Sequence, residues 1–321
     1  MSTDELITAG VPEWMVASMD RLVRGHVNDL DAYLVSVGTE VLLEGTRANC
    51  RCHFIGRDGN GRPRVQALAK ALAEYAVDYC IPRSRIEEAL GHYQLTGSTN
   101  LLVRLSEEAL QLFTSLDKSG EGGEMLLFLI LEHLLGIPQI LCKMSLKTNS
   151  QMHVHGTDGV HAMALPGGGL ALYWCESKLY QSVDAGIDAC FTSIAPFLLD
   201  QGGGESTRDL LLLRDNLDTG DPELDECLVR YFIADTLEAT SVEVRGASLV
   251  GFDLDGYPDP FGSGDGSVSA HVGTMIEDWF DRIGKNVAKL SLEAFALEVF
   301  CIPFPAVGEF RLALRHALGI E

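Results

Sequence analysis

Residues 124–199 carry the pattern that most restricts how this chain folds. A leucine-rich run begins at Glu124 and is typical of a buried helix, which Gly136 and Pro138 are expected to end. Three apolar strand-like segments and a second helix follow, at residues 139–146, 154–165, 170–175 and 181–199. The glycine-rich turn Pro166–Gly169 separates the last two strands. This order predicts an antiparallel meander with helices packed on its face.

The segments after the meander are expected to extend the same sheet and complete an α/β fold. They are a strand near residues 247–253, a helix over 272–288 and a strand over 298–303. Trp279 and Phe280 lie beside acidic residues in this helix, and their spacing favours a stripe that faces the core.

The first 115 residues are expected to form a separate mixed α/β region that binds a partner and regulates the rest of the chain. A glycine-rich loop at residues 119–123 suggests the boundary, so the predicted domains are 1–115 and 116–321. Ser84 is expected to cap a helix. Within the region we predict a helix over 64–79 and strands near 33–41 and 101–105, and further along a loosely structured zone over 201–226.

Acidic residues and a lysine occur where the strands of the meander end. Asp158 precedes the apolar part of the second strand, and Glu176 and Lys178 follow the uncharged run of the third. Side chains two residues apart in a strand project to the same face, so Glu176 and Lys178 should converge. Carboxylates hold hard divalent cations, and a nearby lysine stabilises developing negative charge on phosphate. The pattern therefore favours metal-dependent phosphodiester hydrolysis.

Three further groups are candidates for the same site. The backbone carbonyl of Ser177 is available as an oxygen ligand, and Glu124 is expected to lean over the strand ends from its helix as a further metal-binding carboxylate. Glu132 is a rival for that helix carboxylate, but it lies close to the Gly136 stop, so Glu124 is preferred. Taken alone, a Glu-x-Lys pair is common on solvated strands and indicates little.

The residues of this middle block resemble a known superfamily. Glu124, then Asp158, then Glu176 and Lys178 are similar to the PD-(D/E)XK nucleases of restriction-endonuclease-like fold, although Thr157 stands where many members have proline. More narrowly, GEMLLFLILEHLLGIPQILCKMSLKTN, VHGTDGVHAM and LALYWCESKLYQS resemble the HamA family, the nuclease subunit of the Hachiman antiphage defence system. The end of the chain, ALEVFCIPFPAVGEFR, is similar to that family too.

The resemblance implies an Mg²⁺-dependent deoxyribonuclease, with Mn²⁺ as a substitute, that acts with a superfamily-2 helicase partner (HamB-like) on DNA during phage infection. It implies that Asp158 and Glu176 bind metal, that Lys178 positions the water and the phosphate, and that Glu124 is the helix carboxylate. Tyr180 and Gln181 are expected to flank the site. Cleavage of RNA by the same metal chemistry stays open.

The net charge of −22 favours a different class of protein. The chain has 24 Lys and Arg against 46 Asp and Glu among 321 residues. Proteins that hold nucleic acid by their overall field are basic, because phosphate neutralisation supplies much of that affinity. The alternative is therefore a non-catalytic acidic interaction or inhibitory subunit, such as a DNA mimic. The N-terminus lacks the features of a secretory signal, and we expect a cytoplasmic protein with no membrane partner.

Overall fold

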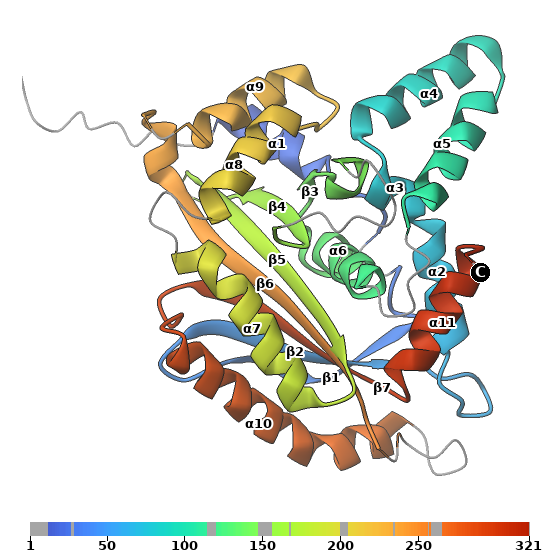
Figure 1. The fold of residues 1–321 in the computed structure, drawn as a ribbon, viewed down its shortest axis with the longest axis vertical. Coiled ribbons are helices and arrows are strands. Elements are labelled where there is room, and N and C mark those ends of the chain that lie inside the picture. Colours follow the sequence, from blue (N-terminus) through green and yellow to red (C-terminus); the bar gives the residue numbers. More distant parts are fainter. Residues whose placement is uncertain are drawn as a thin grey trace, which may run out of the picture.

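The computed structural model describes residues 12–26, 29–113, 120–146, 156–166, 168–199, 205–233, 235–255, 257 and 265–320. These residues form a mixed α/β fold around one seven-stranded sheet (Figure 1). The strands are β1 (Leu34–Leu42), β2 (Arg47–Ile55), β3 (Gln139–Leu141), β4 (Gly159–Ala164), β5 (Leu170–Tyr180), β6 (Val242–Asp253) and β7 (Ala296–Phe304). Their spatial order is β1-β2-β7-β6-β5-β4-β3, with β2, β7, β6 and β5 parallel and the outer strands antiparallel to their neighbours.

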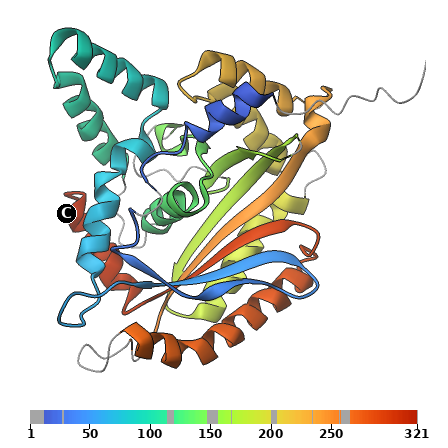
Figure 2. The ribbon, with the colours of Figure 1, turned by 180° about the vertical axis from the view of Figure 1, so that it is seen from behind.

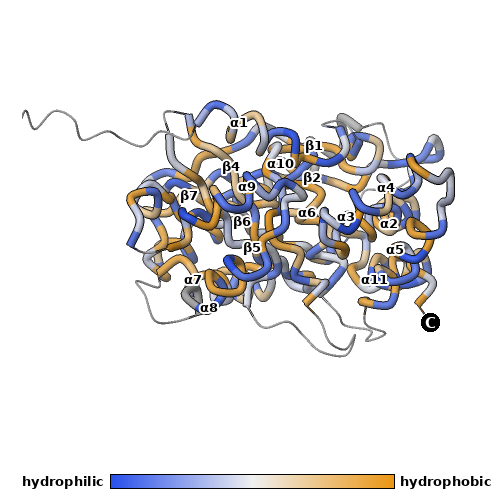
Figure 3. Tube along the Cα trace, turned by 90° about the horizontal axis from the view of Figure 1, so that it is seen from above, coloured by the Kyte–Doolittle hydropathy of each residue, from blue (hydrophilic) through white to orange (hydrophobic). Residues whose placement is uncertain are grey.

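Helices cover both faces of this sheet. The α-helices are α1 (Glu13–Asp20), α2 (Val65–Glu74), α3 (Ala76–Cys80), α4 (Arg83–Thr96), α5 (Asn100–Gln111), α6 (Glu121–Leu135), α7 (Val183–Leu199), α8 (Glu205–Asn216), α9 (Pro222–Tyr231), α10 (Asp265–Lys289) and α11 (Val307–Ala317). One hydrophobic core joins α7 and α10 to the sheet, and a second joins α2, α6 and α11 to the opposite face (Figures 1 and 2). Figure 3 shows hydrophobic and hydrophilic residues intermingled along the chain, as expected where many helices have one buried side.

The meander predicted from the sequence is confirmed, but its first strand ends at Leu141, and Lys143–Leu146 form a 3₁₀ helix instead of continuing the strand. Strands β3, β4 and β5 are antiparallel neighbours, and β4 pairs with β5 from Gly159 opposite Cys175 to Ala164 opposite Leu170. Helix α6 ends at Gly136, whose φ of 64° lies in the left-handed region that glycine adopts without strain. Helix α7 follows β5 after a two-residue bend, as expected.

The segments after the meander also extend the same sheet, as predicted. Strands β6 and β7 pair in parallel with each other, and β6 pairs in parallel with β5. Parallel neighbours need a long crossover, which α10 supplies between β6 and β7. Trp279 and Phe280 are buried in the core on that face, so the predicted core-facing stripe is confirmed.

Four local expectations were wrong. Residues 101–105 form part of helix α5 rather than a strand, because Leu101, Leu105 and Ala109 recur at helical spacing against the core. Residues 121–123 belong to helix α6 rather than to a loop. A Cβ on Gly122 would lie 2.9 Å from Leu314 Cδ2, and one on Gly123 3.0 Å from Ser177 Oγ. The two glycines therefore permit close packing inside a helix.

The other two corrections concern helix starts in polar segments. Ser84 is not a cap, because α4 begins at Arg83 after Pro82, and the Ser84 hydroxyl donates to Asp218 Oδ2 at 2.6 Å. Much of the zone over 201–226 is helical, in α8 and the start of α9, while residues 201–204 lie outside the described residues. The Asp221 side chain caps α9 by accepting from the backbone N–H of Glu223 and Leu224.

The expected boundary near residue 115 does not separate two sheets or two cores. Strand β2 pairs in parallel with β7 from Arg47 opposite Ala296 to Cys52 opposite Cys301, and α2 packs against α11. Without the β1–β2 hairpin, one edge of β7 would present unpaired backbone groups. The N-terminal residues therefore complete the sheet of the rest of the chain, while residues 114–119 lie outside the described residues.

Candidate active site

The four candidate residues from the sequence line one cavity. Its volume is about 1290 Å³, and Glu124, Asp158, Glu176 and Lys178 all lie in its wall. Strand β5 continues from Cys175 to Tyr180 beyond the start of β4. Among the described residues, the β4-side edge of residues 176–180 therefore has no strand partner, and the cavity opens beside this free edge. Ser177, Tyr180 and Gln181 line the same cavity. Tyr180 and Gln181 therefore flank the candidate site, as expected from the sequence.

Asp158 lies immediately before β4 and is held against the free edge of β5. Its Oδ2 accepts from the backbone N–H of Ser177 at 2.6 Å and from the Ser177 hydroxyl at 2.9 Å. The backbone N–H of Asp158 in turn donates to Cys175 O at 2.9 Å. In a strand, the N–H and C=O of one residue point to the same side. The Ser177 carbonyl therefore faces the same edge as Asp158.

Glu176 and Lys178 share the face of β5 that packs against α7, as the period of a strand predicts. Their side chains form an ion pair in which Glu176 is buried and Lys178 is partly exposed. The Glu176 side chain is 4% exposed, whereas that of Lys178 is 25% exposed and reaches the cavity. Cys190 Sγ on α7 donates to the Glu176 backbone carbonyl at 3.4 Å, so α7 also contacts this strand end.

The charges of this group are the Asp158 and Glu176 carboxylates and one cation, Lys178, which interacts with both. Burial and the neighbouring Asp158 charge raise the pKa of Glu176 to about 7, although Lys178 opposes the shift. Burial also raises the pKa of Asp158 against the lowering influence of Lys178 and of the hydrogen bonds from Ser177. Burial alone would lower the pKa of Lys178, but Asp158 and Glu176 raise it above its usual value. Lys178 is therefore a fixed positive charge.

Glu124 approaches the cavity from the other face of the sheet. Helix α6 carries it in its first turn, and Tyr79 of α3 donates its hydroxyl to Glu124 Oε2 at 3.0 Å. Tyr79 also lines the cavity, and burial together with the charges of Glu124 and Asp158 raises its pKa well above the usual value. Tyr79 thus contacts Glu124 directly and is close enough to Asp158 for that charge to affect its pKa. The sequence offered no sign of this, since Tyr79 reads there only as the end of an alanine-rich helix.

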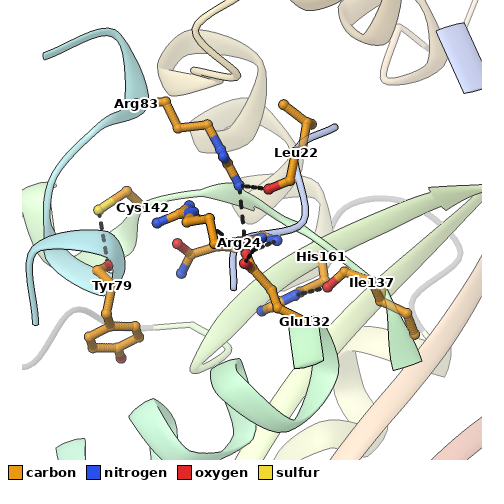
Figure 4. A network of polar contacts seen from close by, with 9 residues as sticks. Leu22, Arg24, Tyr79, Arg83, Glu132, Ile137, Cys142 and His161 are labelled. Carbon is orange, nitrogen blue, oxygen red and sulfur yellow. Dashed lines mark hydrogen bonds and ion pairs between the residues drawn. The ribbon is translucent and has the colours of Figure 1, made fainter. Parts of the chain in front are cut away.

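Glu132 lies outside this cavity, in a separate buried cluster at the far end of α6 (Figure 4). Its carboxylate accepts from the backbone N–H of Arg24 at 2.9 Å and of Gln139 at 3.0 Å. The guanidinium groups of Arg24 and Arg83 lie 3.8 Å and 3.6 Å from Glu132 Oε1. Glu132 therefore ties the N-terminal segment and α4 to α6, and Glu124 is the α6 carboxylate that reaches the site.

A buried clamp holds the chain just before Asp158. Lys143 Nζ donates to the Thr157 carbonyl and lies 3.2 Å from Asp209 Oδ2, which also accepts from the Thr157 N–H at 3.2 Å. Gly156 has a φ of +115°, and a Cβ there would lie 2.3 Å from Asp209 Oδ2. Only glycine fits this conformation and space. Asp209 comes from α8, within the zone that the sequence suggested was loosely structured.

The oxygen donors of the site fit a hard divalent cation. Asp158, Glu176 and the Ser177 carbonyl would supply oxygen ligands of the kind that Mg²⁺ and Mn²⁺ prefer. A bound cation would also favour the charged form of both carboxylates, against the burial that raises both pKa values and the Asp158 charge that adds to the shift at Glu176. Among the described residues, no three His, Cys, Asp or Glu side chains converge closely enough to form a ready metal cluster. Glu124 lies on the far face and is thus less suited than Asp158 and Glu176 to a shared ion.

The fold and the cavity define an α/β protein with a buried carboxylate and lysine site at the free edge of a central strand. The model of the HamA family matches residues 31–318, nearly the whole length, and the chain belongs to this family of the Hachiman antiphage defence system. A search of curated proteins found no match. Within the described residues, no helix has both the length and the apolar composition needed to cross a membrane.

Proposed function

We propose that this chain is a divalent-metal-dependent nuclease that hydrolyses DNA phosphodiester bonds in antiphage defence. The observation that carries the proposal is the convergence of Asp158, Glu176 and Lys178 at the free edge of β5, in a cavity of about 1290 Å³. Two carboxylates with raised pKa values beside a fixed cation form a site suited to charge-stabilised hydrolysis.

The order of elements around the site supports a core of restriction-endonuclease (PD-(D/E)XK) type. Helix α6, strands β3 to β5 and helix α7 follow one another, with the acid before β4 and the acid-x-lysine on β5. The sheet is extended by parallel strands on one side of this unit. Placement of the acids on neighbouring strand ends is the arrangement that the superfamily motif requires.

Each side chain has a role that its surroundings suit. Asp158 and Glu176, with the Ser177 carbonyl, would hold Mg²⁺, which supplies Lewis acidity toward a phosphate oxygen when bound. Lys178 keeps its charge at every physiological pH and reaches the cavity, so it stabilises negative charge that develops on the phosphate and orients the attacking water. The Ser177 N–H and hydroxyl fix the orientation of Asp158. Tyr79 fixes Glu124.

The helicase expected from the family resemblance fits the charge of the chain. With a net charge of −22, the protein repels the DNA backbone at long range and should bind DNA weakly alone. A superfamily-2 helicase partner with a basic surface would bind the DNA and place the strand in the cavity. Because the nuclease would then depend on its partner for DNA binding, cleavage of host DNA in the absence of infection would also be limited.

The full-length chain, alone and together with any superfamily-2 helicase that a neighbouring gene encodes, should cleave plasmid DNA in Mg²⁺ and not in EDTA. Mg²⁺ should also raise the melting temperature of the wild-type chain and leave that of Glu176→Gln unchanged, which tests metal binding without relying on cleavage. A matched control is Glu108→Gln, which removes an exposed acid on α5 that pairs with Arg85 outside the cavity. If no Mg²⁺-dependent cleavage of DNA occurs under either condition, the acidic interaction-protein alternative is favoured.

Weakening the Lys143–Asp209 clamp should lower the cleavage rate more than the binding of DNA. Asp209→Asn keeps an acceptor for Thr157 but removes the buried charge opposite Lys143, which frees the chain before Asp158 to shift. Misplacement of a reacting group by about 1 Å costs up to roughly 100-fold, so we expect kcat to fall about 10-fold to 100-fold with little change in KM. Steady-state cleavage kinetics provide the measurement.

The control for this variant is Asp215→Asn on the same helix, where the acid forms an exposed pair with Arg214. It should leave kcat unchanged. A fall in melting temperature for Asp209→Asn with an unchanged kcat would show that the clamp serves stability alone and does not position Asp158.

A further inference from the structure

Helix α11 forms one wall of the cavity and carries two arginines into it. Arg311 and Arg315 are four residues apart, so they lie on the same side of the helix, and both line the cavity with Val307 and Gly308 of its first turn. Asp253 at the end of β6 accepts from the Val307 N–H at 2.6 Å, which fixes the start of the helix beside the strand ends. The arginines therefore come from a firmly anchored element.

Arg311 is attached to the strand that carries the candidate acids. Its Nη2 donates to the carbonyl of Leu179, the residue after Lys178, at 2.8 Å. Its Nε is buried and has no hydrogen-bond partner among the described residues. Burial lowers the pKa of Arg311 from its usual value, but an arginine stays charged after such a shift. A permanent cation is thus held next to Lys178 with part of its donor capacity unused.

Arg311 differs from most arginines in this acidic chain in the groups that its guanidinium contacts. Arg47, Arg51, Arg85 and Arg282 each form ion pairs with Asp or Glu side chains. In the part of the chain that the structure describes, no ion pair involves Arg311. In a protein with nearly twice as many acids as bases, a cation that lines a cavity and forms no ion pair with a described residue is suited to an anion from outside.

The charges around the cavity point to where such an anion binds. Among the described residues that line it, four are cationic, Lys143, Lys178, Arg311 and Arg315, and four are acidic, Glu121, Glu124, Asp158 and Glu176. These side chains balance one another formally, within a chain of net charge −22. Lys143 is paired with Asp209 and Lys178 with Glu176, whereas Arg311 forms no ion pair with a described residue, and Arg315 lies one helical turn away from it on α11. The α11 wall is the side that attracts phosphate.

We propose that Arg311 and Arg315 bind the backbone phosphates of a DNA strand that flank the phosphate at the Asp158, Glu176 and Lys178 site. The proposal rests on the proposed nuclease function and names the surface that guides the substrate. Guanidinium groups bind phosphate oxygens in two-point contacts, and contacts of this kind set the register of a strand without reading its sequence. Arg311, beside Leu179, contacts the phosphate nearer to Lys178, and Arg315 one farther along α11.

Binding of a fluorescein-labelled 30-base-pair duplex to the full-length chain in EDTA, followed by anisotropy from 20 to 200 mM NaCl, tests the proposal without catalysis. Each phosphate contact contributes about 0.9 to the slope of log affinity against log salt. The double variant Arg311→Met with Arg315→Met should therefore lose nearly 2 from the slope and bind at least about 10-fold more weakly at 20 mM NaCl. Arg311→Lys should bind DNA more tightly than Arg311→Met and less tightly than the wild type, because lysine keeps the positive charge but lacks the two-point donor geometry of a guanidinium group.

Arg230→Met is the matched control, since Arg230 is an exposed arginine in the last turn of α9, outside the cavity. It should keep the wild-type slope. Arg315→Met alone, checked for a wild-type melting temperature, covers the case in which loss of the Arg311 bond to Leu179 perturbs folding. Wild-type affinity and slope in a folded double variant would overturn the proposal, as would an equal loss in the control or no binding by the wild-type chain at 20 mM NaCl.

The two proposals fail in different ways. If the arginine variants lose DNA binding in EDTA but the wild-type chain never cleaves DNA in Mg²⁺, the α11 surface stands and the nuclease does not. If the wild-type chain cleaves DNA and the double variant cleaves it with the same KM, the nuclease stands and the α11 surface does not.

Discussion

Lys178→Met should reduce DNA cleavage by about 100-fold to 1000-fold, the effect seen when one preorganised charge-stabilising donor is removed from a site. Methionine keeps much of the length of the side chain and removes the charge that faces both Asp158 and Glu176. Glu176→Gln should have an effect of at least similar size, because an amide oxygen is a poorer ligand for a divalent cation than a carboxylate. Initial rates of plasmid cleavage in Mg²⁺ measure both.

The double variant of Glu176 and Lys178 gives a sharper result than either single one. Residues that act as a unit lose activity non-additively, so the double variant should be about as inactive as the worse single variant. Lys178→Met leaves the buried Glu176 without its ion-pair partner, and circular dichroism and the melting temperature must show that the fold is retained. Cleavage at the wild-type rate in folded Glu176→Gln or Lys178→Met would refute the assignment of the site.

Glu132→Ala should destabilise the protein by about 3–5 kcal/mol, the cost of leaving buried charges without their partner. The Glu132 side chain is fully buried, and the side chains of Arg24 and Arg83 beside it are each only 13% exposed. Removal of the carboxylate leaves two guanidinium groups close together and also frees the backbone N–H groups of Arg24 and Gln139. Urea unfolding followed by circular dichroism measures the change.

The comparison with Glu124 separates the two α6 carboxylates by their roles. Glu124→Gln keeps an acceptor for the Tyr79 hydroxyl, so it should lower cleavage while changing stability by less than about 1 kcal/mol. Replacing Glu132, Arg24 and Arg83 together by methionine should recover much of the stability lost in Glu132→Ala, because no unpaired charge is then buried. A Glu132→Ala variant of wild-type stability would show that the cluster does not hold the N-terminal segment around Arg24 and helix α4 to α6.

The net charge of −22 does not describe the surroundings of the cavity. From the charge alone, binding of nucleic acid looks unfavourable. In the described part of the cavity lining, cations and acids are equal in number, so the acidic excess of the chain does not extend to these residues. The overall field should therefore make binding weak and strongly dependent on salt, while the α11 arginines provide a local attachment point.

The sequence by itself determined the local parts of this protein. The stop at Gly136, the turn over Pro166–Gly169 and the apolar runs specify α6, β4 and β5 through short-range propensity and periodicity, which depend on near neighbours only. The same-face placement of Glu176 and Lys178 follows from the period of a strand alone. The order of acids and lysine, together with the family resemblance, indicated the candidate site before any tertiary contact was known.

Only the tertiary structure decided which distant residues complete the site. Tyr79 reaches Glu124, Asp209 pairs with Lys143 beside Thr157, and Arg311 reaches the end of β5, over separations of tens to more than a hundred residues. No local pattern encodes such contacts, because they depend on how helices from both ends of the chain pack on the sheet. The same packing turned residues 101–105 into a helix and joined β1 and β2 to β7, since buried backbone and apolar surface must find partners in the whole fold.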